Sequence, residues 1–326
     1  MDRILIIRTD KLGDMVLTLP MAKAIKDKYP AVHLTMLAAH YTQPLLKGQP
    51  LIDDIIFIDD CADNLKDKLS EGKFDAAFFP RPRFDEAFAA FRAGIPARIG
   101  SGYRWYSLLF NHRVYEHRKT AERHEAEYNV RLIDSFFGTK SSVSLVPPVI
   151  AQEKINEISD LLESKSLDLS HESVIIHPGS GGSSRDLNAE NFGRIAQIFS
   201  EKLKWNVFIT GSGAEEEKCR FIASMANAAV NLCNEIDLEA MIALISFSRV
   251  MVSNSTGILH IAAALGKEVI GFYPNSPHLS SRRWGPYTEK RMIFSPPINK
   301  DSQISDDMSF IDMKQVEKEI LVKYGN

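Results

Sequence analysis

The stretch Arg3–Pro20, RILIIRTDKLGDMVLTLP, places a short apolar run directly before a polar turn and a helical pattern. Ile4–Ile7 shows no polar alternation, which is typical of a strand buried on both faces of a parallel sheet. Gly13 and Asp14 stand in the turn, and helical spacing extends from Met15 to Lys28. This order predicts a Rossmann-like α/β unit whose turn lies at the carboxyl edge of the sheet, where such folds bind ligands.

The same alternation of strand and helix continues through the chain and restarts after the polar tract Thr139–Pro148. Further strands are predicted at 32–37, 55–58 and 76–79, and then at 174–177, 205–210, 249–253 and 269–273. Helices are predicted at 124–137, 151–164, 191–203, 215–225, 238–245, 257–265 and 312–324. The fold class is therefore α/β, with two doubly wound domains that face each other across a ligand cleft.

Composition excludes several classes of protein. The 326 residues are 44% hydrophobic and 25% charged, which is ordinary for a globular chain, and the net charge of -3 gives no general attraction to nucleic acid. A local exception lies between residues 76 and 120, where eight basic residues face three acidic ones: Arg81, Arg83, Arg92, Arg98, Arg104, Arg113, Arg118 and Lys119 against Asp85, Glu86 and Glu116. This segment is either a solvated face or an anion-binding surface.

Cysteine usage and hydropathy indicate the compartment. The three cysteines, Cys61, Cys219 and Cys233, are widely spaced and form no Cys-x-x-Cys pair, which suits reduced thiols in a cytoplasm. No apolar run approaches the ~20 residues needed to cross a bilayer, and no signal sequence precedes the first strand. We expect a cytoplasmic protein that is at most peripherally attached to a membrane.

Two of the predicted loops carry candidate functional residues. At the first, a carboxylate at Asp14 is stabilised by a helix N-terminus, and both a helix cap and a catalytic base fit that position. The second, His177–Arg185, is rich in glycine and serine and ends in a guanidinium. Such a loop offers amides, hydroxyls and positive charge to a phosphate, although a flexible surface loop has the same composition.

Two further loops follow strands of the second half. Thr210–Glu217 begins like a dinucleotide fingerprint but lacks the third glycine, so it is a weak signal by itself. Ser253–Gly266 carries hydroxyls and a glycine into a helix of small residues, with His260 in the first turn, where a core or capping histidine is common. The chain contains no Asp-x-Asp, His-Glu-x-x-His, P-loop or Gly-x-Ser-x-Gly motif, so no metal is expected.

Taken together, these loops closely resemble glycosyltransferase family 9, the ADP-heptose:lipopolysaccharide heptosyltransferases. The resemblance rests on Arg3–Pro20, His177-Pro-Gly-Ser with Arg185, Gly211 with Glu215, and Ser253–Gly266. It implies the GT-B architecture, with an acceptor-binding domain at 1–150 and a nucleotide-sugar-binding domain at 151–308. We expect the terminal helix, at 309–326, to pack back toward the N-terminal domain.

The resemblance also implies roles for individual residues. Asp14 matches the proposed general base, and Arg185 takes the position of a phosphate-binding lysine. The remaining donor-binding positions are Ser180, Glu215 for the ribose, Ile236 for the base, Ser255, Thr256, Gly257 and His260. The acceptor is expected at Gly13, Arg81, Arg83 and Arg104. The implied reaction is inverting and metal-independent, needs no cofactor, and transfers a heptose from ADP-heptose to a lipid-linked anionic saccharide of the lipopolysaccharide inner core.

The chain departs from the family pattern at two places, and these keep alternatives open. Ser255-Thr-Gly stands where well-studied members have Asp-Thr-Gly, and Leu187-Asn188 replaces a Trp-Pro pair. Another nucleotide sugar, an epimerase or hydrolase on the same architecture, an oxidoreductase built on Gly211-Ser-Gly213, and an inactive nucleotide-sugar-binding module are the rival interpretations.

Overall fold

The computed structural model describes residues 1–165, 167, 171–182, 184–298 and 305–325. The chain forms two compact units, Met1–Val149 and Ile150–Asn326. The passage from one unit to the next directly follows Pro147 and Pro148, at the end of the tract that the sequence indicated as a boundary. Among the described residues, no helix is both long enough and apolar enough to span a membrane.

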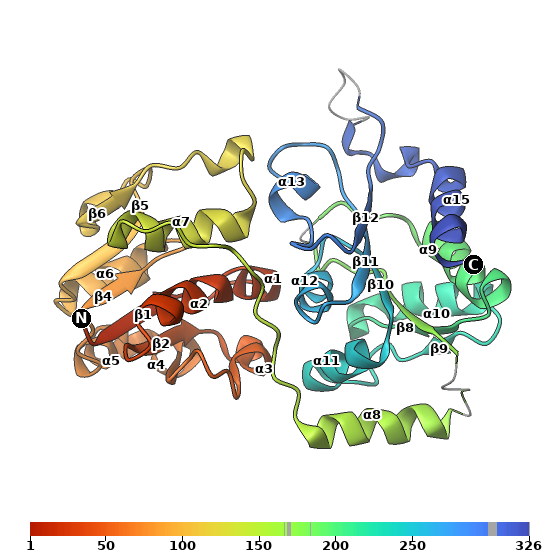
Figure 1. Ribbon diagram of the computed structural model, residues 1–326, viewed down its shortest axis with the longest axis horizontal. Coiled ribbons are helices and arrows are strands. Elements are labelled where there is room, and N and C mark those ends of the chain that lie inside the picture. The colour runs from red at the N-terminus through yellow and green to blue at the C-terminus, as the bar shows by residue number, and fades with distance from the viewer. Residues whose placement is uncertain (166, 168–170, 183, 299–304, 326) are drawn as a thin grey trace. The chain divides into compact units, whose positions relative to one another are not determined.

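The first unit contains a six-stranded parallel sheet in the order β3-β2-β1-β4-β5-β6 (Figure 1). Its strands are β1 (Arg3–Ile7), β2 (His33–Ala38), β3 (Asp54–Phe57), β4 (Ala76–Phe78), β5 (Ala97–Ser101) and β6 (His112–Val114). Ile4 pairs with Leu34 on one side and with Ala76 on the other, and Ile4–Ile7 are at most 1% exposed. The strand order reverses between β1 and β4, which makes the loop after β1 a ligand-binding position.

The helices of the first unit connect these strands. They are α1 (Leu12–Val16), α2 (Leu19–Lys28), α3 (Gln43–Leu46), α4 (Ile58–Cys61), α5 (Leu65–Glu71), α6 (Phe84–Arg92) and α7 (Glu125–Phe137). The single helix predicted at 15–28 is two helices, because Pro20 in the first turn of α2 has no N–H to continue the hydrogen-bonding pattern of α1. Asn129, fully buried on α7, donates to the Leu17 carbonyl at 3.0 Å and fixes the break.

The second unit repeats the topology, with the order β12-β11-β10-β7-β8-β9. Its strands are β7 (Ser173–His177), β8 (Asn206–Ile209), β9 (Val230–Asn231), β10 (Val250–Asn254), β11 (Glu268–Phe272) and β12 (Arg291–Phe294). All printed pairings in both sheets are parallel, and the reversal here lies between β7 and β10. The predicted α/β class is confirmed in both units.

Helices again connect the strands of the second unit. They are α8 (Gln152–Ser164), α9 (Ala189–Gln197), α10 (Glu216–Met225), α11 (Leu238–Phe247), α12 (Gly257–Ala264), α13 (Ser281–Trp284) and α15 (Met313–Tyr324). A π-helical turn, η5 (Ile198–Lys202), extends α9, so the two together cover the helix predicted at 191–203. The 3₁₀ turns of the chain are η1 (His40–Thr42), η2 (Ala62–Asn64), η3 (Ser107–Leu109), η4 (Arg118–Thr120), η6 (Gly213–Glu215) and η7 (Met308–Phe310).

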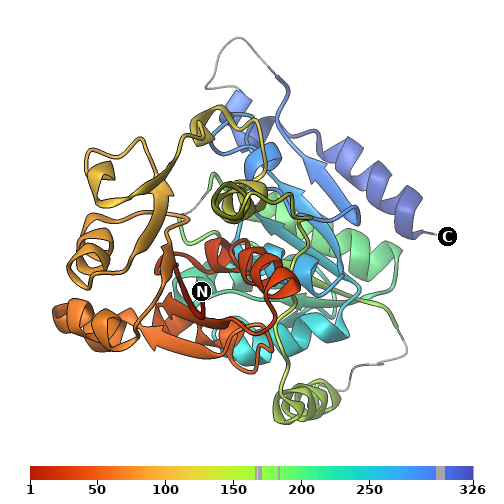
Figure 2. The ribbon, with the colours of Figure 1, turned by 60° about the vertical axis from the view of Figure 1, so that its left-hand side comes forward.

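The C-terminal helix α15 belongs to the second unit. Val316, Ile320 and Tyr324 recur every four residues and enter the core of the second unit. The Tyr324 ring lies 5.4 Å from the Trp205 ring, centroid to centroid. Figure 2 shows this helix in blue at the end of the chain. The apolar side of this helix is therefore buried within its own unit.

Candidate active site

The first cluster of candidate residues lies at the carboxyl end of β1. Asp14 occupies the first turn of α1, and the N-cap of that helix is Lys11, which makes no side-chain capping bond. The Asp14 Oδ1 instead accepts a hydrogen bond from Arg8 Nη2. The helix-cap interpretation of Asp14 is therefore wrong, because its carboxylate is turned toward the preceding strand.

Arg8 joins two carboxylates inside the first unit. The residue is only 2% exposed, and its Nε lies 2.5 Å from Asp10 Oδ1 while its Nη2 reaches Asp14. Asp10 receives a second guanidinium, since Arg81 Nη1 lies 2.5 Å from its Oδ2. One buried positive charge thus orients both acids, and the Asp14 Oδ2 accepts no hydrogen bond from any described residue.

Burial and the neighbouring charges shift the pKa of the Asp14 carboxyl. Burial raises the pKa of Asp14 to about 6, the Arg8 charge opposes the rise, and the charges of Asp10 and Glu125 add to it. A carboxylate with a pKa near neutrality accepts a proton more readily than an ordinary aspartate and is still ionised at pH 7. The cluster therefore contains a carboxylate whose pKa lies closer to neutrality than that of an ordinary aspartate.

A third acid, Glu86 on α6, comes close to the same turn. It is 4% exposed, its Oε1 accepts a hydrogen bond from Thr9 Oγ1, and burial raises its pKa. Arg8 and Glu86 are not among the site residues predicted from the sequence. The only available signal for Arg8 was a charged residue directly after four apolar ones, and nothing local connects Thr9 with a residue 77 positions away.

The structure divides the basic segment 76–120 into two groups. Arg98 and Arg113 donate to backbone carbonyls, and Arg118 pairs with the buried Glu125, so these three support the local fold. The predicted acceptor residues Arg81, Arg83 and Arg104 are exposed. Burial raises the pKa of the Tyr106 hydroxyl, and the positive charges of all three arginines oppose that rise. Gly13 lies beside Asp14 in α1 and is half-buried.

In the second unit, three loops follow three adjacent strands. Ser253 of β10 pairs with His177 of β7, and its Oγ donates to the His177 carbonyl at 2.7 Å. His177 Nδ1 lies 3.1 Å from Thr210 Oγ1, directly after β8, and burial lowers the pKa of His177. The loops predicted to bind the nucleotide sugar therefore start side by side along the carboxyl edge of the sheet.

Asn254 fixes the longest of these loops. Its side chain is fully buried, its Oδ1 accepts from the Leu187 amide at 3.0 Å, and its Nδ2 donates to the Pro178 carbonyl at 2.8 Å. These two bonds hold the start and the end of the loop that carries Ser180 and Arg185. Ser180 is half-buried and Arg185 is exposed, so the guanidinium is accessible to a ligand.

Glu215 stands over the same loop. Its Oε2 accepts from the Ser212 amide at 2.7 Å and from the Ser212 hydroxyl at 2.9 Å, which forms a capping box around η6. A Cβ at Gly179 would overlap the other oxygen, Oε1, so any larger residue there requires the Glu215 side chain to move. The absence of a side chain at Gly179 lets the two loops approach closely.

The remaining donor-binding candidates belong to the β10–α12 turn and the segment after β9. Thr256 is the N-cap of α12 and accepts from the Leu259 amide at 3.3 Å, with Gly257 next in the first turn and His260 buried one turn later. Ser255 hydrogen-bonds the Tyr273 hydroxyl, which also donates to the Trp284 carbonyl at 3.1 Å.

Ile236 lies in a segment that a backbone hydrogen bond attaches to the Gly211 loop. It is half-buried, and the turn before it is attached to the Gly211 loop, because the Asn234 amide donates to the Gly211 carbonyl at 3.0 Å. Asn234 has a φ of 60°, a left-handed conformation that asparagine tolerates better than most residues. The segments that carry the predicted donor residues are therefore linked to one another within the second unit.

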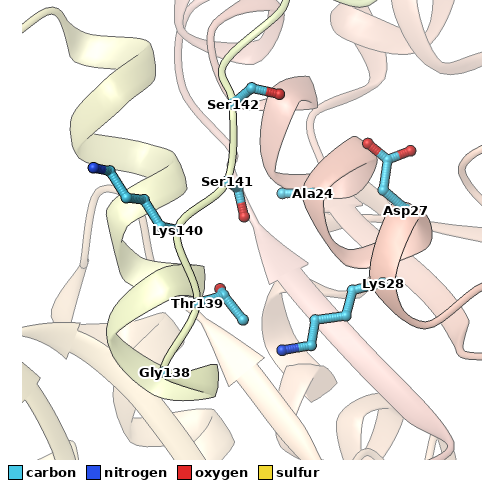
Figure 3. A pocket seen from close by; sticks show the side chains of 8 residues that line it. All are labelled: Ala24, Asp27, Lys28, Gly138, Thr139, Lys140, Ser141 and Ser142. Atoms are coloured by element: carbon cyan, nitrogen blue, oxygen red, sulfur yellow. The ribbon is translucent and has the colours of Figure 1, made fainter.

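Figure 3 shows a pocket of the first unit. It is lined by Ala24, Asp27 and Lys28 of α2 and by Gly138–Ser142 after α7. The hydroxyls of Thr139 and Ser141 bond Asp134 Oδ1 at 2.7 and 2.8 Å, so they serve the end of α7. None of the predicted site residues lines it. In the described part of the chain, no group of three or more His, Cys, Asp or Glu side chains is arranged to hold a metal ion.

Comparison with known sequences gives related enzymes. The model of glycosyltransferase family 9 (heptosyltransferase) matches residues 63–310. A protein named putative glycosyltransferase from Haemophilus influenzae is 29% identical over 347 aligned positions, covering 99% of this chain and 97% of that protein. Lipopolysaccharide heptosyltransferase 2 of Salmonella typhimurium is 27% identical, covering 93% of this chain and 87% of that protein.

Comparison with solved structures supports the fold. A family 9 glycosyl transferase from Veillonella parvula superposes with a TM-score of 0.86 at 19% identity, covering 98% and 96% of the two chains. The ADP-heptose LPS heptosyltransferase II of E. coli superposes with a TM-score of 0.78 at 20% identity, covering 99% and 98%. At these identities the likeness establishes the fold.

The two Rossmann-like units and the related sequences define the class of protein: it is a glycosyltransferase of the GT-B fold. The chain belongs to glycosyltransferase family 9, the heptosyltransferase family, because the family model matches well over half of it. The resemblance noted from the sequence is thereby confirmed.

Proposed function

We propose that the enzyme transfers a heptose from ADP-heptose to a saccharide of the lipopolysaccharide inner core, with inversion at the anomeric carbon. The names of the related proteins support this substrate pair, since they include a lipopolysaccharide heptosyltransferase 2 and an ADP-heptose LPS heptosyltransferase II. The reaction belongs at the cytoplasmic face of the inner membrane, where a lipid-linked acceptor and a nucleotide sugar are both accessible.

Asp14 is the proposed general base. Its Oδ2 takes the proton of the acceptor hydroxyl while that oxygen forms a bond to C1 of the heptose. The bond from C1 to the diphosphate oxygen breaks, its electron pair leaves with ADP, and attack opposite the leaving group inverts the configuration. The observation that carries this proposal is the Asp14 carboxylate held at one oxygen by buried Arg8, with its pKa raised to about 6.

The donor is proposed to bind on the loops of the second unit. Ser180, Thr256 and Gly257 donate hydroxyl and amide hydrogens to the diphosphate, and Arg185 supplies the positive charge. Glu215 has Oε2 occupied by Ser212, so its Oε1 is the oxygen proposed to accept from the ribose. Ile236 contacts the base, and His260 lies close to the donor. These fixed donors stabilise the leaving diphosphate without a metal.

The donor sugar is proposed to depend on Ser255. In this chain its hydroxyl bonds Tyr273, where well-studied family members have a carboxylate. A neutral hydroxyl makes weaker hydrogen bonds to sugar hydroxyls than a carboxylate does. The contact at position 255 therefore differs from that of the carboxylate-bearing members, and the preferred sugar can differ with it. A related nucleotide sugar is the second candidate donor on this ground.

The acceptor is proposed to bind near Asp14, with Gly13 leaving room for its approach. Arg81, Arg83 and Arg104 would pair with carboxylates or phosphates of an anionic saccharide, since guanidinium groups bind such oxyanions in a bidentate manner. Their shared influence on Tyr106 supports one common anion-binding region.

The experiment is an assay with ADP-heptose and a lipid A–Kdo acceptor, followed by mass spectrometry of the acceptor. Addition of one heptose, with no loss of rate in EDTA, supports the proposal. Consumption of ADP-heptose in the absence of acceptor identifies a hydrolase or epimerase instead. Donor binding without turnover on any acceptor identifies an inactive binding module, and thermal stabilisation measures that binding, since a ligand at 100 times its Kd adds about 2.7 kcal/mol.

A further inference from the structure

A group of large apolar side chains on the first unit faces solvent. We call Phe84, Phe88, Trp105 and Leu108 the aromatic surface. Phe84 stacks on Trp105 with 5.0 Å between ring centroids and on Phe88 with 5.6 Å. Trp105 is 80% exposed and Leu108 is 78% exposed. The three rings therefore form one connected stack outside the core, and Leu108 adds a further exposed apolar side chain three residues after Trp105, within η3.

The backbone around Trp105 is held so that these side chains stay outside. Tyr106, between them, is buried, and its hydroxyl donates to the Pro82 carbonyl at 2.7 Å. Arg98 and Arg113 donate to the carbonyls of Leu109 and Phe110, which closes the following turn. The exposure of Trp105 and Leu108 is thus a consequence of an ordered turn whose inward position is already occupied by Tyr106.

Positive charge borders this patch. The Arg92 guanidinium lies 5.8 Å from the centre of the Phe88 ring, and Arg83 and Arg104 directly precede Phe84 and Trp105 in the sequence. None of these three arginines forms an ion pair with another described residue, whereas Asp85 is the one exposed acid on α6 in the same stretch. The patch therefore combines exposed rings with a net positive rim.

We infer that the aromatic surface docks the enzyme onto an anionic lipid bilayer. Tryptophan rings are favourable at the level of the headgroups, leucine reaches the acyl boundary, and arginine pairs with lipid phosphate. Charge complementarity favours this occupant over a second copy of the chain, because two copies would bring the same arginines together. The inference deepens the proposed function, on which its membrane location rests, by naming the surface that meets the bilayer, and vesicle binding tests it without donor or sugar acceptor.

The test is cosedimentation of the full chain with vesicles of phosphatidylethanolamine and phosphatidylglycerol, with pure phosphatidylcholine vesicles as reference. We expect binding to the anionic vesicles that weakens in 0.5 M salt, because the Debye length shortens to a few ångströms. Trp105→Ser with Leu108→Ser should reduce the partition coefficient at least tenfold. The matched control, Ile298→Ser with Phe310→Ser, removes two exposed apolar side chains of the second unit and should bind like wild type.

Two readouts keep docking separate from folding and from catalysis. The Trp105→Ser, Leu108→Ser variant should keep the wild-type melting temperature and the wild-type rate on a water-soluble, deacylated acceptor. If wild type shows no preference for anionic vesicles, or the variant binds them equally well, the inference is wrong. A wild-type dimer that the variant abolishes would assign the surface to self-association instead. Vesicle binding without any sugar transfer would leave docking intact and contradict only the proposed function.

Discussion

The guanidinium of Arg8 donates a hydrogen bond to the carboxylate of Asp14, six residues further along the chain and inside the first turn of α1. This bond turns the carboxylate away from the amides of its own helix and leaves Asp14 Oδ2 for a ligand. It also opposes the effect of burial on the pKa of Asp14, so that the group is mostly ionised at pH 7. Arg8 is therefore a positioning residue for the proposed base.

Replacement of the proposed base should remove the chemical step. We expect Asp14→Asn to lower kcat by about 10²- to 10⁴-fold, the usual contribution of a general base, with the donor KM little changed. The measurement is steady-state transfer at saturating donor and acceptor. Asp27→Asn is the matched control, because Asp27 is an exposed aspartate that pairs with Lys23 on α2. Equal rates for Asp14→Asn and Asp27→Asn would show that another group takes the proton.

The pH profile should report the ionisation of Asp14. A protonated carboxyl cannot accept the hydroxyl proton, so kcat/KM should fall as the pH drops below about 6. Arg8→Gln removes the charge that lowers this pKa, and the acidic limb should move to higher pH. Asp10→Asn removes a charge that raises it, and the limb should move to lower pH. If the acidic limbs of both variants moved in the same direction, the limb could not be assigned to Asp14.

Loss of the buried Arg8 charge changes the stability of the protein as well as its pH profile, and Arg8→Lys separates the two effects. Lysine keeps the positive charge but cannot bond both Asp10 and Asp14 as a fork does. We expect the acidic limb of Arg8→Lys to stay closer to wild type than that of Arg8→Gln, with kcat reduced because Asp14 is less well oriented. Thermal unfolding of both variants measures how much of each change is structural.

Gly179 should be sensitive to the smallest side chain. In Gly179→Ala the new methyl group displaces Glu215, which breaks its bonds to Ser212, so we expect a higher donor KM and a loss of about 1 kcal/mol, as for a removed cap. Adding Glu215→Ala removes the clash. The double variant should lose little more stability than Glu215→Ala alone and should still bind the donor poorly. Wild-type donor binding in the double variant would exclude Glu215 from the donor site.

Asn254→Ala should detach both ends of the 178–187 loop. Two backbone groups lose their partner, each at a cost of about 1–3 kcal/mol if it stays buried, and stabilisation by ADP-heptose should disappear. Asn111→Ala provides the control, because Asn111 makes the same pair of bonds in the first unit, from the Arg98 amide and to the Pro96 carbonyl. Its response to the donor should equal that of wild type in a thermal-shift titration. Equal loss in both variants would mean that the loop does not shape the donor site.

Much of the fold could be predicted from the sequence because its central strands are short, continuous apolar runs. Ile4–Ile7 and Val174–Ile176 are fully enclosed by neighbours, so no polar residue interrupts them. The strands β5 and β6 were missed, since Arg98, His112 and Arg113 lie within them near one edge of the sheet. Helix α6 was missed because three of its phenylalanines, Phe84, Phe88 and Phe91, face solvent and obscure the helical pattern.

Only part of the candidate site could be predicted from the sequence. Glycine-rich loops after apolar strands are visible in the sequence, and the loops of Ser180 and Gly211 indeed follow adjacent strands. The contacts that shape them are long-range: Asn254 holds a loop 67 residues earlier, and Glu86 reaches Thr9 across 77 residues. No local pattern contains such pairs, so Arg8, Glu86 and Asn254 could be recognised only from the structure.

The central claim is that this family 9 enzyme transfers heptose with Asp14 as the base. The most direct measurement is a single-turnover experiment with ADP-heptose and lipid A–Kdo, comparing wild type with Asp14→Asn and determining the anomeric configuration of the product by NMR. We expect one heptose per acceptor, with the configuration inverted relative to the donor, and a rate at least about 10²-fold lower in the variant than in wild type. A product of retained configuration, or an unchanged single-turnover rate in Asp14→Asn, would contradict it.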